Sequence, residues 1–288
     1  MSFADLEAVR SEAGLGVNRF VRLVGLPKTT YYRRREAARR PAHPSSASPR
    51  KRVQAAVMDK IKELCDLHPR LGHRPIHSML VGTDSTASAS SVLRVMQREK
   101  LLQPKRKGKL RPSAPLPPIP AHVGLTVGLD FTHWLGFPVL NVLEYESRYC
   151  LASVVFDRES AENATEGLRR ALSEAERLGL ATSGVVVKSD HGSVFTAGDF
   201  RGFLTEQGCG QALSAVGKPQ GMGRVERFNR SVKEQRLVFE ELSGKDELQG
   251  ALDGYRRYYN EHRPHAALGY ATPLSIVQLK SPQVVPSN

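Results

Sequence analysis

The stretch LTVGLDFT, residues 125–132, places an apolar side chain at every second position. Such alternation is typical of a half-buried β-strand, because successive side chains of a strand point to opposite faces. Val127, Leu129 and Phe131 then share the buried face, and Asp130 lies on the other. The pattern therefore predicts a strand that carries a carboxylate away from its apolar side chains.

The segments that follow predict alternating strands and helices. FPVLNVLEY (137–145) and RYCLASVVF (148–156) indicate two further strands, antiparallel to each other, and GVVVKSD (184–190) indicates a buried strand that ends at Asp190. We expect helices over 159–179, 197–208 and 219–239, and a short strand over 208–214. This order predicts an α/β domain at 123–288, built on a mixed five-stranded sheet with flanking helices.

The last of these helices carries a third acidic residue of interest, Glu226. Three apolar residues at helical spacing predict the buried stripe of the helix: Val225, Phe228 and Val232. Glu226 falls on the neighbouring polar face, after an interval of 35 residues from Asp190. We therefore expect Asp130, from a strand face, and Asp190, from a strand end, to converge on Glu226.

Three carboxylates in one place require positive charge. Within a few ångströms they repel one another, and at least one would take up a proton unless cations intervene. Two Mg²⁺ or Mn²⁺ ions, which prefer oxygen ligands, would resolve the repulsion and would promote an in-line phosphoryl displacement. Taken singly, each residue has a simpler interpretation, as a strand-end cap, a turn residue or an ion-pair partner on a helix. Their joint placement favours a metal-dependent site for nucleic acid, with Asp130, Asp190 and Glu226 as both catalytic residues and metal ligands.

The positive charge of the chain is concentrated in its first 120 residues. They carry 24 Lys and Arg against 9 Asp and Glu, whereas the remainder carries 18 against 20. Such asymmetry favours a basic arm that docks on a polyanion, joined to a nearly neutral unit.

Residues 1–40 have the outline of a helix-turn-helix, in which a helix, a glycine-containing turn and the segment KTTYYRRREAARR follow one another. Three arginines of the second helix are candidate DNA contacts, with a solvated basic helix end as the alternative: Arg33, Arg34 and Arg35. Tyr31 and Tyr32 fit core packing and base contact equally well.

Residues 53–103 predict a second helical DNA-binding domain, in which Ser90 or Ser91 caps a helix. The segments on either side have linker composition. Residues 41–52 are rich in Pro and Ser, and residues 104–122 are basic and then rich in Pro. The second linker adds three candidate DNA contacts: Lys105, Arg106 and Lys107.

The cysteine and histidine patterns argue against two other kinds of site. The three cysteines are far apart and include no CxxC pair, which indicates neither a disulfide framework nor a thiolate zinc site. His68, His73 and His77 have no downstream pair of cysteines, so we expect no zinc there. The start of the chain lacks a secretory pattern, and no run of about 18 apolar residues predicts a membrane span. We expect a cytoplasmic protein.

Residues 123–275 resemble the integrase catalytic core of insertion-sequence transposases. The similarity rests on Asp130, on Asp190 with its nearby glycine, on Gly217-x-Pro219, on the 35-residue interval, and on YNEHRPHAALGYATP at 259–273. It is greatest to the orfB product of the third insertion-sequence group. VNRFVRLVGLPKTTYYRRR and HPRLGHRPIHSML resemble the helical DNA-binding segments of the same proteins. The chain departs from the usual pattern in several places. His191 replaces asparagine, Val194 replaces an acidic residue, GKPQGMGRVE replaces the Asp-Asn-Ala before the glutamate, and Glu144 stands where Asp is frequent.

The resemblance implies a ribonuclease H-like fold and a DDE-type transposase, a member of the retroviral integrase superfamily. Such an enzyme nicks element ends by hydrolysis and then joins the 3′-hydroxyl to target DNA by transesterification. The implied partners are terminal-repeat and target DNA and further copies of the chain, with a separate upstream-frame protein as an open alternative. The bacterial nucleoid is the implied location. Five basic residues around Glu226 are candidate phosphate contacts: Lys218, Arg224, Arg227, Arg230 and Lys233.

Other interpretations stay open. The chain could be a catalytically silent DNA-binding relative or regulator that uses only its helical arms. A ribonuclease H-type nuclease is disfavoured, because such an enzyme needs no paired helix-turn-helix arms. For His262, Arg263 and His265 we favour a structural role.

Overall fold

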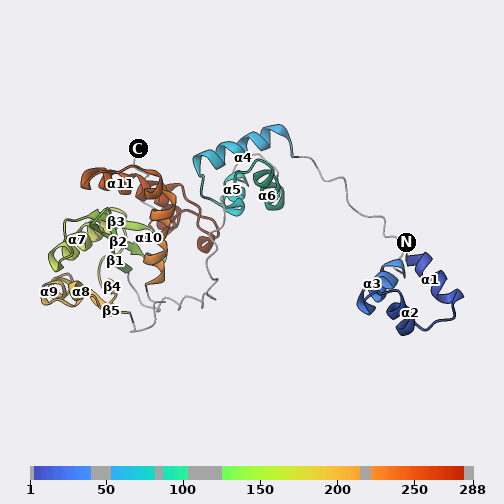
Figure 1. The fold of residues 1–288 in the computed structure, drawn as a ribbon. Helices are drawn as coiled ribbons and strands as arrows, with labels where there is room; N and C mark the ends of the chain where they lie inside the picture. The colour runs from blue at the N-terminus through green and yellow to red at the C-terminus, as the bar shows by residue number, and fades with distance from the viewer. Residues whose placement is uncertain (1–2, 40–52, 82–86, 103–124, 215–221, 282–288) are drawn as a thin grey trace. The chain divides into compact units, whose positions relative to one another are not determined.

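The computed structural model describes residues 3–39, 53–81, 87–102, 125–214 and 222–281 (Figure 1). Contacts divide the chain into two compact units, Met1–Val53 and Gln54–Asn288. Both predicted linkers, 41–52 and 104–122, lie outside the described residues, so the domain boundaries drawn from the sequence stay predictions. No helix in the described ranges combines the length and apolar character that a membrane span needs.

The first unit consists of three helices, α1 (Phe3–Glu12), α2 (Val17–Leu23) and α3 (Lys28–Arg39). Its small core contains Leu6, Phe20, Val21 and Tyr31. Tyr31 is fully buried and donates a hydrogen bond to Glu7 of α1, whereas Tyr32 is exposed. Tyr31 is therefore a core residue. Gly25 ends α2 with a φ of 64°, a left-handed conformation that glycine adopts without strain.

Three helices follow in the second unit, α4 (Ala55–Leu67), α5 (His73–Val81) and α6 (Ala89–Arg98), and each contacts the other two. The cap of α6 differs from the prediction. Ser88, with an extended backbone, accepts a hydrogen bond from the Ser91 amide at 3.2 Å. The expectation of Ser90 or Ser91 as the cap was therefore wrong, because the helix already begins at Ala89.

The sheet contains five strands, β1 (Thr126–Trp134), β2 (Phe137–Glu144), β3 (Cys150–Val155), β4 (Val186–Ser189) and β5 (Gly210–Leu213). Their spatial order is β3-β2-β1-β4-β5. β2 pairs antiparallel with β1 and with β3, whereas β4 pairs parallel with β1 and with β5. The predicted mixed five-stranded sheet is thus confirmed.

One face of the sheet packs against α7 (Ala161–Arg177), α8 (Ser193–Thr196) and α9 (Gly198–Glu206). Val127 and Leu129 of β1 and Leu140 and Val142 of β2 share a core cluster with the buried residues of these helices. Phe131 packs against the same cluster, as the alternation in 125–132 predicts. This face is closed by apolar side chains.

The other face is covered by α10 (Gly223–Gln235) and α11 (Lys245–Glu261), as Figure 1 shows. The predicted stripe of α10 is buried here: Val225, Phe228 and Val232. The helix is shorter than the predicted 219–239, because Arg236 leaves the helical conformation and a 3-10 turn, η2 (Leu237–Phe239), follows. A second 3-10 turn, η3 (Ala266–Leu268), and α12 (Pro273–Lys280) end the described chain.

Candidate active site

The three carboxylates come from three neighbouring elements. The last paired residues of β1 and β4 are Gly128 and Lys188, so that Asp130 and Asp190 each lie two residues further along adjacent parallel strands. The side chain of Asp130 lies on the sheet face that α10 covers, because its neighbours Leu129 and Phe131 face the opposite cluster. Glu226 lies in the first turn of α10.

The carboxylate of Asp130 interacts electrostatically with those of Asp190 and Glu226. Burial, followed by the negative charges of Asp190 and Glu226, raises the pKa of Asp130 from 3.8 to about 7, although a hydrogen bond from Asn229 lowers it. Asp130 is half-buried, whereas Asp190 and Glu226 are exposed. A carboxylate that resists ionisation beside two others marks a place where positive charge would be stabilising.

The side chains do not form a closed ligand set in this conformation. In the ranges that the structure describes, no group of three His, Cys, Asp or Glu side chains has an arrangement that could hold a metal ion. The donor chemistry nevertheless fits a hard divalent cation, because carboxylate oxygens are its preferred ligands. The roles of Asp130, Asp190 and Glu226 as ligands and catalytic residues stay a prediction.

The loop after β4 holds Asp190 through its own backbone. The amide of Gly192 donates to Asp190 Oδ1 at 2.8 Å. A Cβ atom at position 192 would lie 2.9 Å from the same oxygen, so glycine leaves room for this turn. His191 Nε2 lies 2.8 Å from the carbonyl oxygen of Ser214, which ties the loop to the end of β5.

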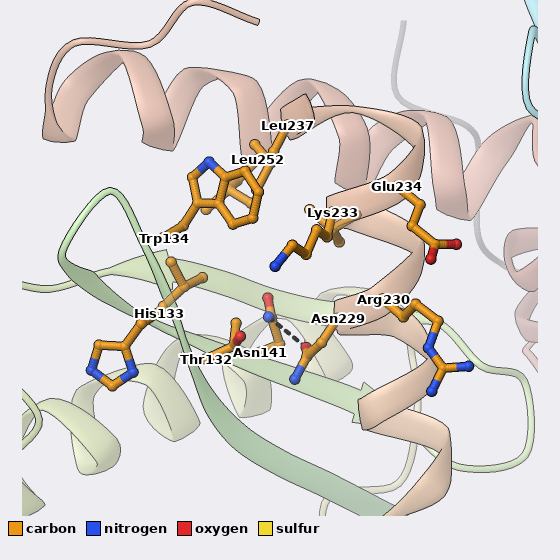
Figure 2. Close-up of a pocket in the computed structure, with 12 residues that line it drawn as sticks. Thr132, His133, Trp134, Asn141, Asn229, Arg230, Lys233, Glu234, Leu237 and Leu252 are labelled. Atoms are coloured by element: carbon orange, nitrogen blue, oxygen red, sulfur yellow. Dashed lines mark hydrogen bonds between the residues drawn. The ribbon is translucent and has the colours of Figure 1, made fainter. Parts of the chain in front are cut away.

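A chain of hydrogen bonds, which the sequence did not reveal, leads to Asp130. Ser153 Oγ donates to Asn141 Oδ1 at 2.6 Å, Asn141 Nδ2 donates to Asn229 Oδ1 at 2.8 Å, and Asn229 Nδ2 donates to Asp130 Oδ2 at 2.9 Å. Figure 2 shows the middle link, between β2 and α10. We call this chain, Ser153–Asn141–Asn229, the relay. It runs from β3 through β2 to α10 and holds the Oδ2 atom of Asp130 in place. The one available signal was that Asn229 follows Glu226 by three positions on a helix.

A cavity of about 320 Å³ adjoins this relay, between the β1–β2 hairpin and α10. Its lining includes Thr132, Trp134, Asn141, Asn229 and Lys233. The ammonium group of Lys233 lies 5.1 Å from the centre of the Trp134 ring. In Figure 2 Lys233 points into the space between Trp134 and Asn229, whereas Arg230 points away from it.

The other predicted DNA contacts fall in several places. Arg224 Nη1 donates to the carbonyl oxygen of Tyr145 at 2.9 Å, and Arg227 is exposed on α10. On α3, Arg33 and Arg34 are exposed and Arg35 is half-buried. Four predicted contacts lie outside the described residues: Lys105, Arg106, Lys107 and Lys218.

Two further residues have structural roles. Glu144 is buried at the end of β2 and accepts the amides of Glu146 at 2.8 Å and Ser147 at 2.5 Å, so it caps the β2–β3 turn. His265 packs edge-on against Tyr259, with ring centres 4.5 Å apart. Burial lowers the pKa of His265 to about 3, with Arg263 contributing, and the residue is therefore neutral at pH 7. The structural role that we favoured for His265 agrees with this packing.

Residues 207–273 match the family model of the integrase core domain. The chain is 26% identical over 282 residues to the uncharacterized 31.7 kDa protein of insertion element IS407 from Burkholderia multivorans, which covers 93% of this chain and 92% of that protein. It is 30% identical over 95 residues to the transposase InsD of insertion element IS2 from Escherichia coli, over 33% of this chain and 31% of that protein. The chain is thus similar to insertion-sequence transposases, and residues 207–273 match an integrase core.

Other relatives match over a shorter length. The chain is 25% identical over 154 residues to the ORF3 protein of Spiroplasma virus SpV1-C74, and the match spans 48% of this chain and only 41% of the viral protein. Among solved structures, the catalytic core domain of BIV integrase aligns with a TM-score of 0.44 and 22% identity, over 54% of this chain and 94% of that chain.

Proposed function

We propose that this protein is a DDE-type transposase that cleaves DNA at the ends of a mobile element and joins those ends to target DNA. The observation that carries the proposal is the placement of the three carboxylates, with Asp130 and Asp190 each two residues beyond the last β1–β4 pair and Glu226 in the first turn of α10. The pKa of Asp130, raised by burial and then by the charges of Asp190 and Glu226, agrees with this placement. Three neighbouring carboxylates repel one another and do not stabilise a fold by themselves. A site that binds positive charge, by contrast, needs such a group of carboxylates. The ribonuclease H-like core expected from the sequence agrees with the mixed sheet, in which β1 carries Asp130 and β4 ends just before Asp190.

Asp130, Asp190 and Glu226 would hold two divalent ions, Mg²⁺ or Mn²⁺. When bound, such ions lower the pKa of an attacking hydroxyl and stabilise the leaving oxygen of a phosphodiester. Asp130 is the anchored ligand, because Asn229 holds its Oδ2 atom. Asp190 and Glu226 are exposed, so that their side chains are free to adjust around a substrate.

The basic residues around the carboxylates would position the DNA backbone. Lys233 lies on the same stripe of α10 as Glu226 and Asn229, at spacings of three and four residues, and points into the cavity beside the relay. Phosphate contacts from such residues orient a duplex without reading its sequence.

The three helices of the first unit would supply sequence recognition as a helix-turn-helix, with Arg33, Arg34 and Arg35 against the DNA. The exposed arginines of α3 support this assignment. We further propose that copies of the chain assemble on DNA, because two element ends must be held together during transposition. A separate upstream-frame protein could add a second DNA-binding partner.

The test is the variant Asp190→Asn, which keeps the shape of the side chain and removes its charge. We expect DNA cleavage in Mg²⁺ or Mn²⁺ to fall to below about one-thousandth of wild type, because a ligand charge is lost. Binding of terminal-repeat DNA should change little, since it depends on other residues.

The matched control is Asp199→Asn, an exposed aspartate in the first turn of α9, which should leave cleavage unchanged. Equal loss of binding and cleavage in Asp190→Asn would make Asp190 a structural residue. A wild-type protein that binds the repeats but never nicks them would favour the silent DNA-binding relative.

A further inference from the structure

A second cavity, of about 130 Å³, lies on the other side of α10 and is lined by four arginines. Arg148 comes from the β2–β3 turn, Arg224 and Arg227 come from α10, and Arg263 follows α11. Ser231, Tyr259, His265 and Ala267 complete the lining. We refer to this cavity as the arginine pocket.

The arginine pocket has no matching negative charge. Among the residues with described positions, no carboxylate forms a salt bridge with Arg148, Arg224, Arg227 or Arg263. Glu144 is the nearby acid that influences Arg148 and Arg224, but its oxygens accept the amides and hydroxyl of its own turn. The charge of Arg224 therefore acts against that of Arg148, and Glu144 offsets this repulsion without forming an ion pair with either arginine.

Arg148 carries the clearest mark of a missing partner. Its Nη1 atom is buried and has no hydrogen-bond partner. Burial and the charge of Arg224 lower the pKa of Arg148 to about 10, which shows that the group is held in an unfavourable place for a cation. Its backbone also has a φ of 67°, a left-handed conformation that is uncommon for a residue with a side chain. A buried unpaired donor of this kind costs stability unless a ligand accepts from it.

Two other guanidinium groups are held in place by neutral partners. Arg263 Nε donates to Gln235 Oε1 at 2.9 Å, and Arg224 Nη1 donates to the carbonyl oxygen of Tyr145 at 2.9 Å. These contacts orient the groups without neutralising them. The pocket is therefore organised before any ligand arrives, which lowers the entropic cost of binding.

We propose that the arginine pocket binds a phosphate group. Guanidinium groups present paired N–H donors that match two oxygens of a phosphate, and the anion would satisfy Arg148 and relieve the repulsion among its neighbours. A carboxylate ligand offers only two oxygens, whereas a phosphate offers enough acceptors for several guanidinium groups at once.

The position of the pocket relates it to the candidate active site. Arg224, Arg227 and Ser231 are spaced by three and four residues and form one stripe of α10, and Glu226 lies on a different stripe. Helix α10 thus presents Glu226 to one side and Arg224 and Arg227 to another. The phosphate could come from the DNA backbone, a source that rests on the proposed function, or from a free phosphate ion.

The first experiment measures thermal unfolding of the full-length protein in inorganic phosphate and in chloride at equal ionic strength. We expect phosphate to raise the melting temperature of wild type. Arg148→Gln and Arg227→Gln should weaken phosphate binding by about tenfold or more, because each removes a charge-assisted contact. Arg227 is exposed on α10, so its variant keeps the test valid if Arg148→Gln folds poorly. The control Arg201→Gln removes an exposed arginine of α9 and should behave as wild type.

The second experiment measures binding of a DNA duplex as a function of salt, in EDTA so that no cleavage occurs. Affinity falls as salt rises, and loss of one phosphate contact makes the slope of log affinity against log salt less steep by about 0.9. A less steep slope in Arg148→Gln and Arg227→Gln than in Arg201→Gln would identify the DNA backbone as the source. A phosphate effect in the first experiment with unchanged slopes would identify the free ion.

The proposal is overturned if phosphate and chloride stabilise wild type equally and all three variants have the same salt slope. Neither readout involves cleavage. An inactive enzyme with an intact phosphate effect would therefore contradict the proposed function alone.

Discussion

The two faces of the sheet differ in what they contain. The face under α7 is closed by apolar side chains, among them Leu129, Leu140 and Leu168. The face under α10 and α11 also has an apolar cluster, but Asp130, Asn141 and Ser153 lie within the sheet on this side and are joined by hydrogen bonds through Asn229. We infer that one face supplies stability alone, whereas the other combines an apolar cluster with the polar groups of the candidate active site.

The largest expected effect on stability lies on the α7 face. Leu168 is fully buried against the sheet, so Leu168→Ala would leave a cavity and lower the free energy of unfolding by about 2–5 kcal/mol. Urea unfolding would measure the loss. Cleavage per folded molecule should stay near wild type, and a specific loss of cleavage in this variant would contradict the separation of the two faces.

A pH-dependent effect is expected on the α11 side, at His265. Its pKa is about 3 in the folded protein, below the ordinary value of 6.5. The unfolded chain therefore takes up a proton between about pH 6.5 and pH 3 that the folded chain cannot accept. The stability contributed by neutral His265 is fully present above pH 6.5 and declines as the pH falls through this range, by up to about 1.4 kcal/mol per pH unit.

The variant His265→Gln would isolate that contribution, because glutamine stays neutral. Urea unfolding across this pH range should give a flatter profile for the variant than for wild type. Parallel profiles would indicate that His265 gains a proton without loss of its packing against Tyr259.

The variant Asn229→Ala should show the smallest change in stability and a large change in cleavage activity. Asn229→Ala would remove one hydrogen bond to Asp130 and one from Asn141, with a loss of about 1 kcal/mol. Cleavage should fall by about 10- to 100-fold, and the Mg²⁺ concentration for half-maximal rate should rise, because Asp130 loses its support.

Asn163→Ala provides the matched control on α7, where the Asn163 side chain donates to the carbonyl oxygen of Arg158 at 2.8 Å. We expect a similar small loss of stability there and an unchanged response to Mg²⁺. Identical metal responses in the two variants would mean that Asn229 is no more than a packing residue.

Much of the fold was predictable from the sequence because its signals are local. Alternation in 125–132 assigned Asp130 to the face opposite Leu129, and helical spacing assigned Val225, Phe228 and Val232 to the core. The position of the cap at Ser88 was missed, since several serines in that stretch fit the pattern equally well.

The polar contacts of the site were not predictable, because they join residues far apart in the chain. Asn229 and Asp130 are 99 positions apart, and Asn141 and Asn229 are 88 positions apart. Arg148 was predicted only as the first residue of the strand 148–156. Its side chain lacks a partner because α10 and the segment after α11 approach it, which the sequence does not show.

The equal distance of Asp130 and Asp190 from the last β1–β4 pair has a consequence for insertions and deletions. The chain between them can lengthen or shorten at the loops around α7 without moving either carboxylate. The pairing of β1 with β4 alone sets how far along the strands Asp130 and Asp190 lie. One extra residue within β4, by contrast, would turn Asp190 to the opposite side of the sheet. Active relatives should therefore differ in the length of the connection that contains α7, whereas the length of β4 should stay constant.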